Sequence, residues 1–267
     1  MPYVYSALYE GGERTPGVFL TGETPRHQLL PAIRWLVEHL GARQWAVVGD
    51  DYVWPRVSAA RTRRYLADSG ARLRDEVFVP LGTEDFGPVL RRLERSGCEA
   101  VLMLLVGDDA VQFNRQFAAA GLDERCARLS PLMSEDMLLA SGAAATRGLF
   151  VAAGYFESLP TAHGLDFTGR FAARFGAEAP VLNSLGESCY EAVRLLAALV
   201  DRAGTTDVGA VTAAAAADGV AYEGPRGDVR LRRAHVEQQV YLARADGLEF
   251  DVLDALVPGV GDGCRCR

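Results

Sequence analysis

The chain has 267 residues, of which 49% are hydrophobic and 24% charged, so its composition is that of a globular protein and excludes disordered, collagen-like and coiled-coil chains. Its formal net charge of -7 argues against a nucleic-acid surface, which needs a basic stripe. All 28 basic residues are arginine. Because lysine is absent, a Walker phosphate loop and a Schiff-base enzyme are excluded as well.

The first part of the chain predicts a helix followed by alternating strands and helices. Thr24 is a predicted N-cap with Pro25 at the first helical position, and Gly41 follows the end of this helix. Apolar runs then predict strands at 45–49, 76–79, 100–106 and 149–155, separated by helices at 55–69, 84–96 and 109–120. This alternation is typical of βαβ units and predicts an α/β fold with mostly parallel sheets flanked by helices.

The pattern changes after Phe156. Two long helices are predicted at 163–175 and 184–203, and strands return as antiparallel pieces at 228–232, 236–244 and 249–253. Residues 257–267 are predicted to be a disordered tail. A late return of strands indicates two lobes between which the chain crosses more than once, and ligands of such folds bind between lobes at the carboxyl ends of strands.

Aromatic side chains follow the first strong strand. Tyr52 and Trp54 lie two residues apart, and Pro55 fixes the entry into the next helix. Such a pair suits a small neutral or zwitterionic ligand, because each ring offers apolar area and one directed hydrogen bond. Packing within the fold is the alternative interpretation of the pair, and Tyr5 and Met133-Ser134 could line the same cleft.

The sequence gives no support to a catalytic or metal site. Asp50-Asp51 and Asp108-Asp109 are adjacent pairs, and adjacent side chains usually diverge; the second pair fits a helix N-terminus. The four histidines lack ligand spacing, and serine-hydrolase and dinucleotide motifs are absent from the sequence. We therefore expect no enzyme activity, no cofactor and no metal, and we interpret the five cysteines as free thiols, three of them in or near the core.

No apolar run approaches the roughly 20 residues of a membrane helix. The first residues also lack a basic segment followed by an apolar one. As written, the chain is expected in the cytoplasm; a longer chain with an upstream export signal would place it in the periplasm or at the cell surface.

Taken in order, several short motifs resemble those of the type I periplasmic binding proteins. The similarity covers almost the whole chain to about Leu253, and its most specific part is Gly49-Asp50-Asp51-Tyr52-Val53-Trp54-Pro55-Arg56. The other matching motifs are Tyr9-Glu10-Gly11, Thr21-Gly22-Glu23, Pro31 with Trp35-Leu36, Val79-Pro80-Leu81-Gly82 with Asp85-Phe86, Val106-Gly107, Ala120-Gly121-Leu122, Ser134-Glu135, Tyr155-Phe156 and Tyr190-Glu191-Ala192. The branch that it resembles most binds urea and short-chain amides and includes amide sensors of amidase operons, with branched-chain amino acid binding proteins as wider relatives.

The resemblance implies a two-lobed fold that closes on a small ligand without performing chemistry. Lobe 1 would comprise 1–21 and 156–226, and lobe 2 would comprise 22–155 and 227–256. Family members begin with further βα units, so lobe 1 is expected to be truncated. The resemblance implies ligand contacts at Tyr5, Ser6, Tyr52, Trp54, Val106, Gly107, Met133 and Ser134.

Two positions favour a larger ligand than urea. Ala7 stands where the family has a threonine, and Met133 where a small hydroxyl residue is common, so the pocket is expected to be more apolar. A larger amide or an aliphatic amino acid fits this better than urea.

The resemblance implies one of two roles. The first is capture of an amide, urea or a branched-chain amino acid for the permease of an ABC-type importer. The alternative is a cytoplasmic amide sensor that negatively regulates an amidase operon by binding a regulatory protein. Both roles need a small-molecule ligand and a protein partner, neither involves nucleic acid, and a homodimer is compatible with both.

Overall fold

A computed structural model describes residues 1–176, 178–217, 220–232 and 234–256. The chain forms two compact units. Among the described residues, unit 1 consists of Met1–Thr24 and Gly154–Val240, and unit 2 consists of Pro25–Ala153 and 241–256. The chain therefore passes between the units after Thr24, Ala153 and Val240.

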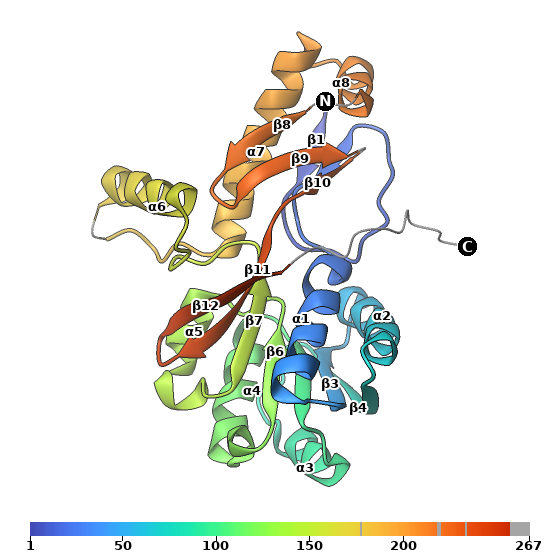
Figure 1. The fold of residues 1–267 in the computed structure, drawn as a ribbon, viewed down its shortest axis with the longest axis vertical. Helices are drawn as coiled ribbons and strands as arrows, with labels where there is room; N and C mark the ends of the chain where they lie inside the picture. Colours follow the sequence, from blue (N-terminus) through green and yellow to red (C-terminus); the bar gives the residue numbers. More distant parts are fainter. Residues whose placement is uncertain (177, 218–219, 233, 257–267) are drawn as a thin grey trace. The chain divides into compact units, whose positions relative to one another are not determined.

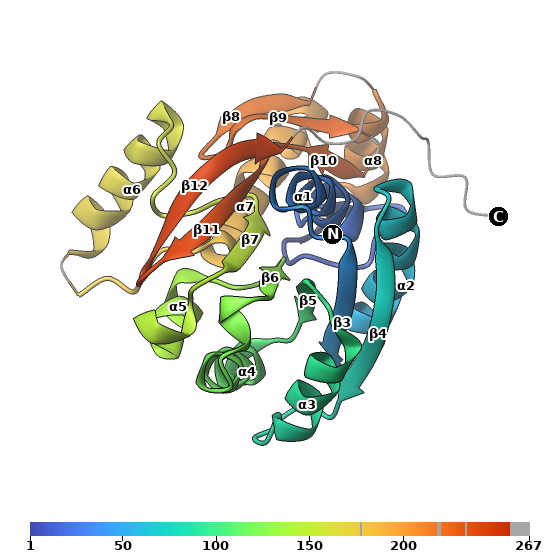
Figure 2. The same cartoon turned by 60° about the horizontal axis from the view of Figure 1, so that its bottom comes forward.

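Unit 2 contains a seven-stranded sheet in the order β12-β11-β7-β6-β5-β3-β4 (Figure 2). The pairs from β7 to β4 are parallel, and β11 runs antiparallel to β7. The strands are β3 Gln44–Asp50, β4 Arg72–Val79, β5 Ala100–Leu104, β6 Ala127–Ser130, β7 Leu149–Ala153, β11 Val240–Asp246 and β12 Glu249–Leu256.

Helices cover both faces of this sheet, with α1 and α2 on one side and α3, α4 and α5 on the other (Figure 2). They are α1 Pro25–Leu40, α2 Val53–Asp68, α3 Gly87–Ser96, α4 Gly107–Ala119 and α5 Glu135–Ser141, with the short 3-10 helices η1 Leu122–Glu124 and η2 Ala143–Ala145. Every residue of β5 and β7 is buried, because a strand in the middle of such a sheet has a helix layer on either face.

Unit 1 has a smaller five-stranded sheet in the order β1-β2-β10-β9-β8 (Figure 1). Its strands are β1 Tyr3–Tyr5, β2 Val18–Leu20, β8 Ala221–Gly224, β9 Gly227–Arg232 and β10 His235–Glu237, and its helices are α6 Ala162–Phe175, α7 Ser184–Ala203 and α8 Val208–Ala216. The first three strands of that order are parallel, and β9 and β8 are antiparallel to their neighbours.

The core of unit 1 lies between this sheet and the helices α7 and α8. One cluster of buried apolar side chains joins β2, β9 and β10 to both helices, and it consists of Phe19, Leu195, Leu199, Val211, Ala215, Val220, Val229, Leu231 and Val236. Leu195 and Leu199 are one helical turn apart, so α7 presents one face to the sheet.

The α/β prediction with mostly parallel, helix-flanked sheets is confirmed, but the unit boundary differs from the predicted one. The prediction assigned 227–256 to lobe 2, whereas β9 and β10 belong to the sheet of unit 1. Two contacts hold β10 there: His235 pairs with Leu20 of β2, and its Nδ1 lies 2.7 Å from the hydroxyl of Tyr9. The predicted tail, 257–267, lies outside the described residues.

Among the described helices, none is both long and apolar enough to cross a membrane.

Candidate functional site

Six of the eight predicted ligand residues follow three neighbouring strands of unit 2. Tyr52 and Trp54 follow β3, Val106 and Gly107 follow β5, and Met133 and Ser134 follow β6. Because β3, β5 and β6 are parallel neighbours, their carboxyl ends lie at one edge of the sheet. This edge is the place where open α/β sheets bind ligands.

Asp50, the last residue of β3, ties two of these loops together. Its Oδ2 accepts a hydrogen bond from the backbone N–H of Val106 at 2.8 Å. Burial raises the pKa of Asp50 to about 7, against the effect of the Val106 bond, and a hydrogen bond with the carboxyl group of Asp109 raises it further. Asp109 is itself anchored, since its Oδ2 accepts from Gly82 N at 2.9 Å. The carboxyl group of Asp50 is therefore protonated in part near neutral pH.

The two aromatic residues that follow β3 have different surroundings. Their ring centroids are 6.4 Å apart. Trp54 is buried on the same face of α2 as Ser58 and Thr62, so it serves packing within unit 2, whereas Tyr52 is half-buried. The indole Nε1 of Trp54 is buried without a hydrogen-bond partner among the described residues. A buried donor of this kind is costly unless a water or a ligand accepts from it.

The loop after β6 is held by Ser130. Its Oγ accepts from the backbone N–H groups of Leu132 and Met133, at 3.2 and 3.0 Å. The Met133 side chain is buried, and its Sδ accepts from Asn114 Nδ2 at 3.6 Å, so this side chain is directed toward α4. Ser134 is the N-cap of α5 and is buried. The accessible groups of the predicted set in unit 2 are therefore Tyr52, Val106 and Gly107.

The remaining two predicted residues, Tyr5 and Ser6, lie in unit 1, where the start of α7 holds them. Ser188 Oγ donates to the carbonyl of Ser6 at 2.6 Å, and the Ser6 hydroxyl lies 3.6 Å from the thiol of Cys189. Tyr5 ends β1 and packs edge-on against Tyr9 at 6.2 Å. Both predicted residues are half-buried.

A buried ion cluster that sequence reasoning missed lies in the same unit. Arg226 pairs with Glu23 and with Glu187, and Glu191 lies beside them. Burial raises the pKa of Glu187 to about 8, although Arg226 opposes this shift. The signal available in the sequence was weak, because these residues come from three distant segments.

The cluster also leaves no room for side chains at two glycines. A Cβ at Gly154 would clash with the guanidinium of Arg226, and one at Gly224 would clash with the carboxylate of Glu191. Gly154 N donates to Glu23 Oε1 at 3.0 Å. Glu23 lies next to the point where the chain leaves unit 1, and Gly154 is the residue at which it returns, so the cluster holds both of these ends of unit 1.

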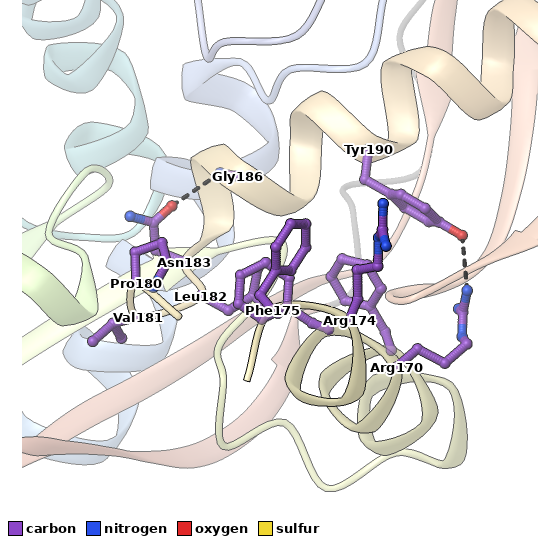
Figure 3. A pocket seen from close by; sticks show the side chains of 11 residues that line it. Arg170, Arg174, Phe175, Pro180, Val181, Leu182, Asn183, Gly186 and Tyr190 are labelled. Carbon is purple, nitrogen blue, oxygen red and sulfur yellow. Dashed lines mark hydrogen bonds between the residues drawn. The ribbon is translucent and has the colours of Figure 1, made fainter. Parts of the chain in front are cut away.

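A cavity of about 580 Å³ lies elsewhere in unit 1, between α6 and α7 (Figure 3). Its lining combines aromatic and aliphatic side chains with arginines, and the hydroxyl of Tyr190 accepts from Arg170 at 3.3 Å. The full lining is Phe167, Arg170, Phe171, Arg174, Phe175, Pro180, Val181, Leu182, Asn183, Gly186 and Tyr190. The eight predicted ligand residues take no part in it.

Within the described part of the chain, histidine, cysteine and acidic side chains form no group of three or more that could hold a metal ion. One expectation about the cysteines is wrong. Cys189 is exposed on α7, whereas Cys126 is buried and Cys98 is half-buried.

Comparison with known proteins identifies the family. A family profile described as periplasmic binding protein matches residues 1–249. The chain belongs to this family. It is similar to the Leu/Ile/Val-binding protein homolog 6 of Brucella suis biovar 1 (strain 1330), at 25% identity over 243 residues, which are 87% of this chain and 61% of the relative. The chain thus spans about three fifths of the length of that curated relative.

Solved structures of periplasmic binding proteins share the fold. The solute-binding protein of an ABC transporter from Rhodopseudomonas palustris HaA2, in complex with p-hydroxybenzoic acid, has a TM-score of 0.82 at 23% identity, covering 91% of this chain and 68% of the other. A periplasmic binding protein from Burkholderia mallei has a TM-score of 0.84 at 17% identity, covering 96% and 70%. These likenesses confirm the predicted fold, and the family profile confirms the predicted family. The names of the relatives are those of binding proteins rather than enzymes.

Proposed function

We propose that this chain acts as a non-catalytic solute-binding protein, which captures a small organic molecule for an ABC-type importer. The observation that carries the proposal is the edge of unit 2, where backbone and aromatic groups from three parallel strands gather within a binding-protein fold. Tyr52, Val106 and Gly107 supply its accessible groups. Tyr5 and Ser6 are the residues that unit 1 would contribute.

The charges at this edge favour a ligand rich in hydrogen-bond donors. Two acidic residues lie at or after the carboxyl end of each of the three strands, and these are Asp50, Asp51, Asp108, Asp109, Glu135 and Asp136. Asp51 is paired with Arg56 at 2.6 Å, and the pKa of Asp50 is raised to about 7 by burial and by the neighbouring Asp109. Such an edge attracts an ammonium or amide N–H₂ group and disfavours a bare carboxylate.

The ligand would also need an acceptor and an apolar part. The buried Nε1 of Trp54 offers a donor, and the half-buried ring of Tyr52 offers apolar area. An aliphatic amino acid or an alkyl amide satisfies all three conditions. A Leu/Ile/Val-binding relative supports the amino acid, whereas the ligand of the R. palustris protein, p-hydroxybenzoic acid, has the carboxylate without the amine.

Thermal unfolding in the presence of single ligands tests the proposal. The panel is leucine, isoleucine, valine, acetamide, butyramide, urea and p-hydroxybenzoate. A ligand at 100 times its dissociation constant should raise the free energy of unfolding by about 2.7 kcal/mol. We expect this stabilisation from an amino acid or an alkyl amide, and a shift with p-hydroxybenzoate alone would contradict the charge argument.

Two variants of the loop after β3 locate the site. Tyr52→Ala removes a half-buried ring and should abolish most of the ligand-induced shift. The matched control is Val53→Ala, since the neighbouring Val53, the first residue of α2, is 62% exposed and its variant should keep the shift. Equal shifts in both variants would place the ligand elsewhere.

The partner distinguishes the two roles considered for the chain. In the importer role, the ligand-loaded protein should stimulate ATP hydrolysis by a reconstituted permease and ATPase complex. Binding to a regulatory protein of an amidase operon, with no such stimulation, would instead support the amide-sensor role.

A further inference from the structure

Two thiols meet at the amino-terminal edge of the unit 2 sheet. Cys98 lies two residues before β5, and Cys126 lies directly before β6. These strands are parallel neighbours in which Ala100 is opposite Ala127, and Ala127 N donates to the carbonyl of Glu99 at 2.9 Å. The start of the ladder therefore holds the two cysteines side by side, with 3.7 Å between their Sγ atoms.

We propose that Cys98 and Cys126 are a redox modification site, at which a reversible disulfide forms. Neighbouring strands lie about 4.8 Å apart, within the range of Cα separations that a disulfide spans. The sulfur atoms must approach to about 2.05 Å, a movement that side-chain rotation can supply. The bond would join two strand starts that the sheet already holds together.

The oxidant is a small-molecule disulfide such as oxidised glutathione. The thiolate of Cys98 attacks one of its sulfurs, forming a mixed disulfide and releasing one glutathione thiolate. Cys126 then loses its proton and attacks the sulfur of Cys98, which releases the second glutathione. Two protein thiols are oxidised and one glutathione disulfide is reduced to two glutathione molecules.

The exposure of the two residues sets this order. Cys98 is half-buried and Cys126 is buried. Both line one concavity of about 250 Å³, together with Leu93, Glu94, Gly97, Glu99, Phe117, Leu122 and Arg125. An oxidant can therefore reach Cys98 from solvent, and the buried Cys126 resolves the mixed disulfide.

Electrostatics support the same division of roles. A hydrogen bond from the thiol of Cys126 lowers the pKa of Cys98 to about 7, against the effect of burial, and the hydroxyl of Ser96 lowers it as well. The same interaction and burial raise the pKa of Cys126. The attacking residue is thus a thiolate to a useful extent at neutral pH.

The disulfide would close the segment 98–126, which contains β5, α4 and η1. Closing a loop of this length should raise the melting temperature of unit 2 by about 5 to 10 °C. The bond lies at the amino ends of the strands, whereas Val106 and Gly107 follow the carboxyl end of β5. Oxidation should therefore leave the ligand-induced shift of the proposed function unchanged, so the two proposals can fail separately.

Peptide mapping after equilibration in glutathione buffers tests the site. Trypsin cleaves after Arg95, Arg115, Arg125 and Arg128, so Cys98 falls in peptide 96–115 and Cys126 in peptide 126–128. We expect these two peptides to be linked in oxidising buffer and separate in reducing buffer, with the higher melting temperature in the linked protein. Under reducing conditions, iodoacetamide should label Cys98 faster than Cys126.

The variants Cys98→Ser and Cys126→Ser should each lose the linked peptide and the rise in melting temperature, and Cys126→Ser should retain a mixed disulfide on Cys98. Cys189→Ser is the matched control. Because Cys189 is exposed on α7, this variant should keep both the linked peptide and the rise in melting temperature. Failure of the two peptides to link in folded wild-type protein, under conditions in which Cys189 becomes glutathionylated, would overturn the proposal.

Discussion

Asp50 shows how one carboxyl group makes the stability of unit 2 depend on pH. Its pKa is raised from 3.8 to about 7, first by burial, so the folded state prefers the protonated form. A raised pKa gives a contribution to stability that is complete below pH 3.8 and is lost as the pH rises through about 7. Asp50 therefore costs stability in neutral and alkaline solution while it anchors Val106.

The variant Asp50→Asn tests this dependence. The amide keeps an acceptor for Val106 N and a donor for Asp109, but it does not ionise. We expect its free energy of unfolding, relative to wild type, to increase between pH 5 and pH 8 by about 1–2 kcal/mol, allowing for solvent screening. Urea unfolding at both pH values measures this difference.

Asp51→Asn is the control for that experiment. Asp51 is exposed and its hydrogen bond with Arg56 lowers its pKa, so its ionised form is the stable one in the folded state. Its removal should produce no gain at high pH. A wild-type curve parallel to that of Asp50→Asn across the pH range would contradict the assignment of the proton.

At the scale of elements, α8 depends on its first residue. Asp207 is the N-cap of this nine-residue helix, and its Oδ1 accepts from Ala210 N at 2.9 Å. The helix is short and brings Val211 and Ala215 to the core of unit 1. Local capping therefore matters more here than in a long helix.

We expect Asp207→Ala to lower the stability of unit 1 by about 1 kcal/mol, because a backbone N–H loses its partner. Asp207→Asn keeps a side-chain acceptor for Ala210 N, so it should lower the stability of unit 1 by only a small part of this amount. Hydrogen exchange at 208–216, together with urea unfolding, measures the effect. Equal exchange rates in wild type and Asp207→Ala would show that packing alone maintains the helix.

The sequence predicted those elements whose signals are local. Thr24, Pro25 and Gly41 bracket α1, and the structure places that helix at Pro25–Leu40. The strands β1 and β2 have three residues each, too few for any period to be read from them. Their pairing with each other and with β10 connects distant parts of the chain, and nothing in the pattern of either strand specifies its neighbours.

For the candidate site, too, the sequence predicted the features with local signals and not the contacts between distant segments. Strand ends in the sequence led to Tyr52, Val106 and Gly107, which the structure places on neighbouring strands. The carboxylates were interpreted as adjacent pairs, Asp50-Asp51 and Asp108-Asp109, whereas the interacting pair is Asp50 with Asp109. Asp50 and Asp109 come together because β5 lies next to β3 in the sheet. The order of strands in a sheet depends on the whole fold, so the local sequence did not predict this contact.

At the scale of the whole molecule, the division into units follows strand pairing rather than sequence order. Residues 227–240 resemble the strands that follow them, and the prediction joined the two groups. In the structure, β9 and β10 extend the sheet of unit 1, while β11 and β12 extend that of unit 2. The boundary after Val240 thus falls at the start of β11, which a pattern of apolar residues cannot tell apart from β10.

The strands β7 and β11 are paired in the sheet, although the chain between them belongs to unit 1. These strands are antiparallel, and Tyr241 lies opposite Ala153. Everything from Gly154 to Val240 is therefore an insertion between the two arms of a β-hairpin. Replacing it with an Asn-Gly turn should give a continuous chain of 25–153 and 241–256 that folds by itself, since such turns connect antiparallel arms readily.

Circular dichroism and a cooperative urea transition of this minimal chain would test the idea, and an unfolded product would refute it. If it folds, unit 2 does not need the segment from Gly154 to Val240. Another domain could then be inserted at the same hairpin in its place.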